Sequence, residues 1–478
     1  MSSLSLVPVG ASVVSQAVNA VKNLGKTTSY WRYTFQSTFK TTLGPLVLLW
    51  MLLAATPIAA QQNVLVIIAD DLGVDYMASY EEGSEYAPTP TLDKLAEEGL
   101  LFTNAWAYPG CSPTRASILT GRFGFRNGVG TVVTMESQAG ISTEEYTLPK
   151  ALADANSGYD HSLIGKWHLA DENNGGDLNP NIMGFDHYTG DLFTDKIDFF
   201  EWEKTTNGEV ATVSNYMPTE NVDDAIAWLE THEGPWFQWL AFVNPHTPHH
   251  LPPLDLHRYD YLPGSRWHIR NNPIPYFKAS VEAMDSEINR LFEYLKTTGE
   301  YDNTTIIFIG DNGTDGSVVQ PPFDADRAKS FLYEGGINIP FIVAGPSVAV
   351  ANEKSDALVQ VVDIFATVLD LIGVDINQVN PAGNTLDSLS LTPILANPEA
   401  DVRDWVFTEM FGYNDTQDGK AIRNQVYKLL RFDSGITEFY NLQNDPFEQE
   451  NLLDGPLTTE EQNHFDWLNS QLEQLLSS

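Results

Sequence analysis

The sequence predicts an α/β protein built around a mostly parallel sheet, and two observations support this fold class. Four short runs are continuously apolar and rich in β-branched residues, as strands buried on both faces of a parallel sheet are: 63–69, 239–243, 305–309 and 341–344. Segments of helical character lie between them, at 91–98, 222–230, 277–296 and 361–371. This alternation indicates a layered α/β fold, in which ligand sites gather beyond the carboxyl ends of the strands.

The first 60 residues differ in composition from the rest of the chain. They contain no acidic residue and four basic ones, Lys22, Lys26, Arg32 and Lys40. An apolar run at 46–55 and small residues up to position 60 follow, an order typical of a secretory signal peptide or leader over residues 1–60. The alternatives are an uncleaved anchor or initiation near Leu43, but the apolar run is shorter than the roughly 18–20 residues that span a bilayer. We therefore expect a secreted or periplasmic protein with no stable membrane insertion.

The chain is strongly acidic, with 64 Asp and Glu against 26 Lys and Arg and a net charge of −38. Loss of the leader would bring the charge to about −42, because its four charged residues are all basic. Such a surface repels phosphate groups, which argues against nucleic-acid or anionic-membrane partners. An anionic substrate would also be repelled at long range, so its site must be locally basic.

Acidic residues follow two of the predicted strands. Asp70 and Asp71 end the first strand, and Asp311 and Asn312 follow the third. Either pair alone is most often a turn, since Asp, Asn and Gly favour turn geometry. At equivalent strand ends, however, the two pairs would bring four oxygen donors to one point. Oxygen donors suit calcium or magnesium rather than zinc.

Cys111 is the only cysteine of the chain, so it cannot form an internal disulfide. A free cysteine is most often a small buried hydrophobic residue. Here it opens the run C-S-P-T-R-A-S-I-L-T-G-R at 111–122, which closely resembles the signature of the formylglycine-dependent (type I) sulfatases. In that family a formylglycine-generating or sulfatase-maturating enzyme oxidises this cysteine to an aldehyde, 3-oxoalanine or formylglycine.

Further motifs follow in the order of the sulfatase family. The run G-K-W-H-L at 165–169 contains Lys166 and His168, and N-P-H-T-P-H at 244–249 resembles the family's P-H-x-P element, with His246 as the aligned histidine. Lys329 precedes Y-E-G-G by the family's spacing. Taken singly, such a lysine is most often a surface residue and such a histidine a core residue. A chance match of all these motifs in the family's order is very improbable. The resemblance covers about residues 63–453.

The resemblance implies an alkaline phosphatase-like fold. That fold has a large mixed, mostly parallel central sheet flanked by helices and a smaller C-terminal α+β subdomain. We expect the catalytic domain at 61–400 and the subdomain at 401–478. The resemblance also implies one divalent cation, usually Ca²⁺ with Mg²⁺ as the alternative, bound by the modified Cys111 and four further residues, Asp70, Asp71, Asp311 and Asn312.

The implied activity is hydrolysis of a sulfate ester through a covalent sulfo-enzyme intermediate. One oxygen of the hydrated aldehyde at position 111 would attack sulfur, and the other would later expel the sulfate. Arg115, one helical turn after Cys111, would hold this diol, which Asp311 helps to activate, and Lys166 and Lys329 would neutralise sulfate oxygens. By the same resemblance, His246 would protonate the leaving alcohol and His168 would assist the loss of sulfate.

Three functions stay open from the sequence. The first is a secreted sulfatase that acts on a sulfated carbohydrate or polysaccharide fragment. Tryptophans that could stack on sugar rings favour such a substrate, namely Trp202, Trp228, Trp236, Trp239 and Trp267. The second is a phosphate or phosphonate ester hydrolase of the same superfamily, and the third is a non-enzymatic sulfoglycan-binding protein with an unmodified Cys111. The loops at 175–215 and 249–272 are expected to select the substrate. Asn338 stands where many members of the resembled family have arginine; if that arginine supports the site, the support differs here, but no expected ligand or catalytic group is lost.

Overall fold

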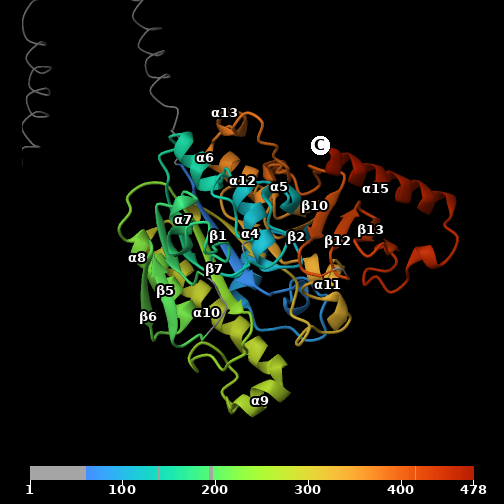
Figure 1. The fold of residues 1–478 in the computed structure, drawn as a ribbon. Coiled ribbons are helices and arrows are strands. Elements are labelled where there is room, and N and C mark those ends of the chain that lie inside the picture. The colour runs from blue at the N-terminus through green and yellow to red at the C-terminus, as the bar shows by residue number, and fades with distance from the viewer. Residues whose placement is uncertain (1–60, 138, 193–197, 415) are drawn as a thin grey trace, which may run out of the picture. The chain divides into compact units, whose positions relative to one another are not determined.

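The computed structural model describes residues 61–478 except 138, 193–197 and 415 (Figure 1). The predicted leader lies outside the described residues. Gln61–Ser478 form one compact unit. None of the helices in the described part of the chain has both the length and the apolar character needed to cross a membrane.

A 10-stranded sheet in the order β10-β2-β9-β8-β1-β7-β3-β4-β5-β6 forms the centre of this unit. Its five middle strands, β8, β1, β7, β3 and β4, run parallel, whereas β9 is antiparallel to both β8 and β2. The predicted large mixed, mostly parallel sheet is thus confirmed. The strands span Asn63–Asp70 (β1), Gly99–Trp106 (β2), Asp160–Gly165 (β3), His187–Gly190 (β4), Trp202–Thr206 (β5), Glu209–Val213 (β6), Trp236–Pro245 (β7), Thr304–Gly310 (β8), Phe341–Ala344 (β9) and Glu353–Gln360 (β10).

Helices cover both faces of the sheet, because successive side chains of each buried strand point to opposite sides. Val64, Val66 and Ile68 of β1 belong to the core beneath α4 (Cys111–Thr120), α6 (Leu148–Asp154) and α12 (Asp363–Ile372). Leu65, Ile67 and Ala69 belong to the core beneath α3 (Pro90–Glu98), α8 (Met217–Leu229) and α10 (Pro273–Thr298). Shorter helices are α5 (Gly124–Asn127), α7 (Asn179–Ile182), α9 (Arg266–Asn271), α11 (Glu334–Ile337), α13 (Ile376–Val379) and α14 (Thr392–Ala396).

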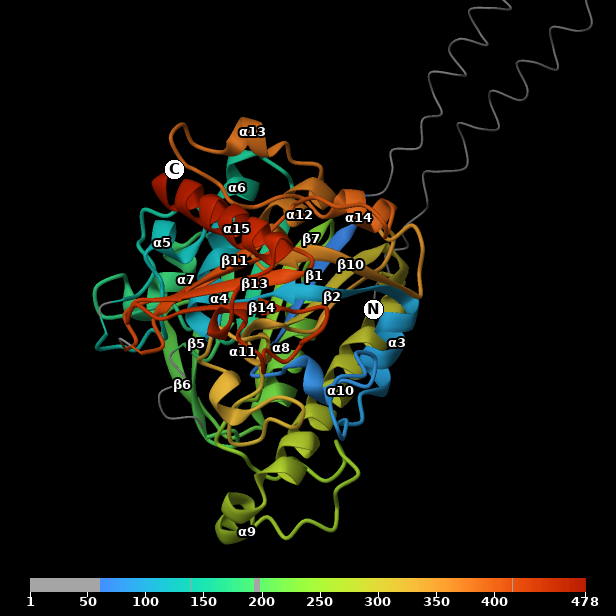
Figure 2. The ribbon, with the colours of Figure 1, turned by 90° about the vertical axis from the view of Figure 1, so that its right-hand side faces the viewer.

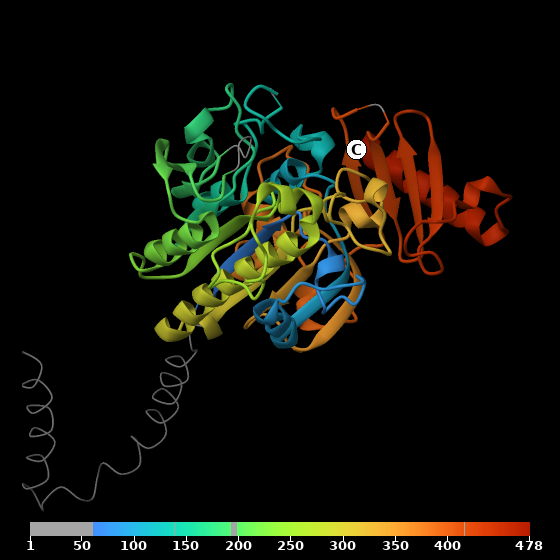
Figure 3. The same ribbon diagram turned by 90° about the horizontal axis from the view of Figure 1, so that it is seen from below.

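A second, antiparallel sheet of four strands follows near the C-terminus, with α15 (Thr459–Ser477) packed against it (Figures 2 and 3). Its strands are β11 (Val406–Met410), β12 (Gly419–Arg423), β13 (Tyr427–Phe432) and β14 (Thr437–Asn441). Thr458 and Glu461 form a capping box that starts α15. The predicted C-terminal α+β subdomain is present, and its boundary at residue 400 stays a prediction.

The tryptophans proposed for sugar stacking correct one expectation. Trp202, Trp228, Trp236 and Trp239 are all at most 6% exposed, so their rings pack in the cores rather than on a binding surface. Among the five, Trp267 alone is exposed, at 73%. Large aromatic side chains are more often core residues, because their burial removes much apolar surface from water.

Candidate active site

The two predicted metal-binding pairs lie together at the carboxyl ends of β1 and β8. The parallel register pairs Ala69 with Gly310, so the residues that follow each strand meet at the same edge of the sheet. The Asp71 backbone N–H donates to Asp311 Oδ1 at 3.1 Å, and Asn312 Nδ2 donates to Asp71 Oδ1 at 2.8 Å. The sequence-based expectation that these residues converge is confirmed.

Three oxygens of this group are buried and have no hydrogen-bond partner among the described residues: Asp70 Oδ1, Asp71 Oδ2 and Asn312 Oδ1. Both Asp311 oxygens have partners, in Asp71 N and Arg115. A buried oxygen without a partner costs free energy unless another group satisfies it. Carboxylate and amide oxygens in this arrangement fit a hard cation such as Ca²⁺ or Mg²⁺.

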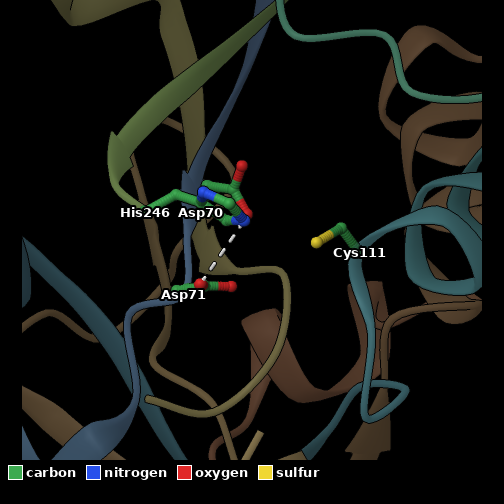
Figure 4. A group of neighbouring side chains, drawn as sticks. All are labelled: Asp70, Asp71, Cys111 and His246. Atoms are coloured by element: carbon green, nitrogen blue, oxygen red, sulfur yellow. Dashed lines mark ion pairs between the residues drawn. The ribbon is translucent and has the colours of Figure 1, made fainter. Parts of the chain in front are cut away.

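Cys111 lies beside these oxygens. It is the first residue of α4, is 1% exposed, and presents its sulfur toward the tips of β1 and β7 (Figure 4). Ligand atoms of Cys111, Asp70, Asp71 and His246 all lie within 4.8 Å of one another. Burial and the Asp70 carboxylate raise the pKa of the Cys111 thiol to about 12. An unmodified thiol would therefore be protonated and a weak nucleophile at neutral pH.

Arg115 follows one turn later in α4, as predicted, and its planar side chain links two strands. Its Nη2 and Nε lie 2.7 and 3.2 Å from Asp311 Oδ2, while Nη1 donates to the Lys166 carbonyl oxygen at 2.9 Å. These contacts join the start of α4 to the residues that follow β8 and β3. The structure thus gives Arg115 a position beside Asp311, and a direct contact with a modified residue 111 stays a prediction.

Two lysines bring positive charge to the same point. Lys166 follows β3, is fully buried, and its ammonium group forms an ion pair with Asp70. Lys329 Nζ lies 2.5 Å from Asp71 Oδ1. Although burial opposes the charge, Asp71 is the main group that holds the pKa of Lys329 well above its usual value, so this side chain stays protonated.

The two predicted histidines differ in their surroundings. His246 follows β7, and its Nε2 lies 3.7 Å from Asp71 Oδ2. His168 is 5% exposed, its Nδ1 has no partner among the described residues, and its carbonyl oxygen accepts a hydrogen bond from Ser112 Oγ at 2.9 Å. Burial lowers the pKa of both imidazoles, and Lys166 contributes to this at His168. Both rings are therefore neutral at pH 7.

The pKa values of the buried carboxylates Asp70 and Asp311 are shifted in opposite directions. Burial raises the pKa of each, but at Asp70 the neighbouring basic groups, with Lys166 the largest contributor, outweigh it and hold the pKa well below its usual value. At Asp311, burial and the charge of Asp70 raise the pKa to about 7. Two carboxylates with pKa values driven apart at one point are typical of a functional site.

Other residues that support the site were not predicted. Ser112 links α4 to His168 and also accepts a hydrogen bond from the Val133 backbone at 3.0 Å. Thr314 accepts from Gly73 N at 3.0 Å and donates to Asp75 Oδ1 at 2.5 Å, which fixes the turns after β1 and β8. Ser112 stands inside the cysteine motif and could have been chosen from it, whereas nothing in the sequence pairs Thr314 with Asp75.

Asn338, the departure noted in the sequence, is buried, and its Oδ1 has no partner among the described residues. The nearby Glu334 carboxylate instead meets two cations of the C-terminal sheet, with Arg423 Nη1 at 3.4 Å and Lys428 Nζ at 3.0 Å. Glu334, Asn338 and Arg423 line the same pocket, so a charged group from β12 lies near Asn338.

Comparisons with known proteins identify the family of the chain. The family model named Sulfatase matches residues 62–374, and the model named N-sulphoglucosamine sulphohydrolase, C-terminal, matches residues 325–477. N-acetylgalactosamine-6-sulfatase of Rattus norvegicus is 27% identical over 370 residues, which cover 70% of this chain and 65% of that protein. N-acetylglucosamine-6-O-sulfatase of Bacteroides thetaiotaomicron is 25% identical, with 82% of each chain covered. The uncharacterized sulfatase YdeN of Escherichia coli is 29% identical, with 70% of this chain and 66% of that protein covered.

The chain thus spans slightly less than two thirds of the length of YdeN and of the rat enzyme. Among solved structures, Ps i-CgsB in complex with k-i-k-neocarrahexaose is similar, with a TM-score of 0.73, 25% identity, and 87% of this chain and 92% of that chain covered. The structure of BT4656 in complex with D-glucosamine-2-N,6-O-disulfate has a TM-score of 0.71 at 22% identity, with 87% and 99% covered, and supports the fold alone. The family model covers well over half of the chain and includes every residue of the assembled site, so the chain belongs to the sulfatase family.

Proposed function

We propose that this chain hydrolyses sulfate esters of a sulfated carbohydrate or polysaccharide fragment. One observation carries the proposal: Cys111, partnerless acidic and amide oxygens, and the cations Arg115, Lys166 and Lys329 meet where β1, β3 and β8 end. A sulfate ester reacts at an atom surrounded by anionic oxygens. Its hydrolysis therefore depends on positioning and on cations around the transferred group, as in phosphoryl transfer.

The same oxygens support a divalent cation, Ca²⁺ or alternatively Mg²⁺. We infer that Asp70, Asp71, Asp311 and Asn312 would hold it next to position 111. Three carboxylates and three basic side chains cancel one another in formal charge, so a bound divalent ion would leave the site positive in a chain of net charge −38. When bound, the ion would polarise the sulfate and lower the pKa of an oxygen nucleophile.

The proposal includes conversion of Cys111 to formylglycine by a maturating enzyme. The hydrated aldehyde would supply the nucleophilic oxygen and lead to the covalent sulfo-enzyme intermediate that the family resemblance implies. Support comes from the position of Cys111 at the start of α4, among the ion-binding residues, and from the raised pKa of its thiol, which disfavours catalysis by the unmodified side chain.

The remaining side chains receive roles that their surroundings support. Lys166 and Lys329 are protonated and can bind sulfate oxygens, while Arg115 keeps Asp311 and the start of α4 in place. Both histidines are neutral before substrate binds. Binding of an anionic ester would favour the protonated form of His246, which could then donate its proton to the leaving alcohol, and His168 would assist the release of sulfate.

A saccharide substrate is supported by the relatives. Two of them are named for sulfated amino sugars, and Ps i-CgsB was crystallised with a neocarrahexaose. We propose a secreted or periplasmic location, where such saccharides occur. The acidic chain is poorly suited to nucleic acid.

Two measurements test the proposal together. The mass of the peptide that contains Cys111, from protein produced with a maturating enzyme, should be about 18 Da below the unmodified value. This protein should release sulfate from members of a panel of defined sulfated saccharides, and Cys111→Ala should lower the rate at least about 1000-fold.

Paired phosphate and sulfate esters of the same alcohol separate the alternatives. Faster cleavage of the phosphate or phosphonate ester would overturn the proposal in favour of the related hydrolases. An unmodified Cys111 in protein from the native source, together with saccharide binding and no turnover, would leave a sulfoglycan-binding protein.

A further inference from the structure

The segment that follows β7 carries the most exposed large apolar side chains of the described residues. Trp267 is 73% exposed, Tyr261 71% and Leu254 60%, and all three belong to residues 254–272, here called the α9 arm. Exposed apolar side chains do not stabilise the fold, because only burial removes their surface from water. Several of them on one segment therefore indicate a site that binds a partner.

The charges of the α9 arm indicate an anionic partner. Arg266 and Arg270, one helical turn apart on α9, are exposed and form no hydrogen bond, ion pair or cation–π contact with any residue that the structure describes. Every other lysine and arginine among the described residues has at least one such partner. Two neighbouring arginines without an acidic partner are unusual in a chain with 64 acidic residues, and they are available to bind an anionic partner.

The arm is held in place rather than loosely attached. Tyr276 OH accepts a hydrogen bond from Gly264 N at 3.2 Å and lies 2.8 Å from His268 Nδ1. Leu262 and Tyr276 pack together in a small apolar cluster, and Arg258 Nε bonds Glu282 Oε1 of α10 at 2.8 Å. A surface fixed before binding loses less conformational entropy when a partner binds.

The arm is connected to the active-site segment through the chain and through α10. It follows His246 and His249, and the His249 ring lies 6.0 Å from the ring of Phe277 in the first turns of α10. From Phe277, α10 extends about one turn further, roughly 6 Å, before the chain enters α9. Figures 1 and 2 both show α9 projecting from the molecule at the end of α10 that lies beyond the sheet.

We propose that the α9 arm binds a second, non-reacting part of a sulfated saccharide chain while one of its sulfate esters lies at Cys111. The inference rests on the proposed function and narrows its substrate to a chain with several sulfated units. Trp267 and Tyr261 offer flat apolar faces for sugar rings. Arg266 and Arg270 offer forked donors for sulfate groups, which share the geometry of phosphate.

Other partners fit these observations less well. An anionic membrane would meet the acidic body of the chain, and two arginines are fewer than the basic clusters that hold proteins on such membranes. A protein partner would need a larger contact area than one short helix and its neighbours supply. A linear polyanion needs only a narrow track with separate basic points along it.

The test compares an arm variant with wild type on substrates of increasing length. The variant combines Arg266→Gln, Trp267→Ala and Arg270→Gln. A matched control combines Arg431→Gln with Ile436→Ala, a partly exposed arginine of β13 and an exposed apolar residue of the turn that follows β13. Sulfate release is measured on one sulfated saccharide series from the monosaccharide to the octasaccharide.

In wild type and control, kcat/KM should rise with chain length. In the arm variant, KM for the octasaccharide should rise about tenfold with kcat nearly unchanged, because only binding remote from the reacting ester is lost. The monosaccharide should be cleaved at the wild-type rate within twofold. Equal rates of arm variant and wild type on the octasaccharide, or an equal loss at every length, would overturn the inference.

A binding measurement separates this inference from the proposed function. Wild type and the arm variant are titrated with dextran sulfate and with neutral dextran of the same length. If the arm variant binds dextran sulfate about tenfold more weakly than wild type, the inference is supported, even if wild type cleaves no sulfate ester. Absence of cleavage would contradict only the proposed function. Unchanged dextran sulfate binding would overturn the inference, as would a variant that loses only binding to phosphatidylserine vesicles or only self-association in sedimentation.

Discussion

At the scale of single residues, the site depends on a few side chains that each satisfy two or more partners. Arg115 is the clearest case, because its guanidinium bonds Asp311 through two nitrogens and the Lys166 carbonyl through a third. A planar fork can do this, whereas a lysine ammonium offers one compact charge. The positions of a carboxylate that we propose as a metal ligand and of a lysine that we propose to bind sulfate therefore depend on one buried side chain.

Arg115→Lys should therefore lower kcat/KM at least about 100-fold and the free energy of unfolding by about 3 kcal/mol, because it leaves a buried carboxylate incompletely paired. Sulfate release and urea unfolding measure the two effects. Arg122→Lys is the matched control, since its pair with Glu145 is partly exposed and should be worth less than about 1 kcal/mol. Retention of more than a third of the activity by Arg115→Lys would show that its fork is dispensable.

The raised pKa of Asp311 predicts how cation binding depends on pH. With a pKa of about 7, this carboxyl group is protonated in acid in the cation-free protein, and the proton must leave before an ionised oxygen can bind a cation. Ca²⁺ affinity should thus be constant above about pH 8 and fall about tenfold for each pH unit below about pH 6. Calorimetric titrations of protein stripped with a chelator, between pH 5 and 9, measure this slope.

Asp311→Asn should bind Ca²⁺ more weakly and remove most of the slope, because an amide does not titrate. Glu399→Gln is the control, because Glu399 is exposed and far from the site in sequence. This variant should keep the wild-type dependence of Ca²⁺ affinity on pH. If Asp311→Asn kept the full pH dependence, another group would have to carry the proton.

At the scale of elements, the buried strands were predictable because their apolar runs need no tertiary information. The predicted runs all lie within β1, β7, β8 and β9. Strand direction and order were not predictable: β9 runs antiparallel between β8 and β2, and β5 and β6, the last two strands at one end of the sheet, are short and polar with little apolar signal. These features depend on which segments meet in space, which local composition does not encode.

In the candidate site, too, some features could be predicted from the sequence and others could not. The convergence of Asp70 and Asp311 followed from their places after parallel strands, and Arg115 followed from helical spacing. The contact of Arg115 with Asp311 and the Ser112 bond to His168 required the tertiary arrangement of α4. The exposed tryptophan could not be separated from the four buried ones, because residue type alone does not give burial.

The C-terminal sheet is joined to the large domain by a buried cluster of charges. Lys428 of β13 is fully buried and lies 3.0 Å from Glu334 Oε1 of α11 and 2.7 Å from Glu448 Oε1. The helix α11 begins a few residues after Lys329. The cluster thus connects the subdomain to the segment that delivers a lysine to the active site.

Lys428→Met should lower the free energy of unfolding by about 3–5 kcal/mol, because it leaves two buried carboxylates without their main counter-charge. It should also reduce sulfate release through a poorly placed Lys329. Lys420→Met on the neighbouring strand β12 is the control: its partner Asp433 is 3.8 Å away and half exposed, so the change should be under 1 kcal/mol. Similar urea midpoints for the two variants would contradict a structural role of the cluster.

At the scale of the whole molecule, the negative charge of the chain opposes the binding of an anionic substrate at the site. A net charge of −38 disfavours the approach of any anion, and the same charge destabilises the compact state through self-repulsion. A divalent cation among the partnerless oxygens would reduce both effects. Binding at one point should therefore be visible in the stability of the entire chain.

Calcium should accordingly raise the thermal unfolding midpoint of protein that has been stripped with a chelator. Binding to the folded state alone adds about 2.7 kcal/mol when the free ion is at 100 times its Kd, which for a domain of this size corresponds to a midpoint shift of a few degrees. Mg²⁺ should give a smaller shift, because it demands a stricter geometry and releases its water reluctantly. Asp71→Asn should abolish the shift, since it weakens one of the carboxylates with a partnerless oxygen, whereas the exposed Asp356→Asn should retain it. A larger shift with Zn²⁺ than with Ca²⁺ would point instead to binding by an unmodified Cys111 thiol and the His246 imidazole, the donors that zinc prefers, and would count against both the oxygen-bound cation and the modification of Cys111.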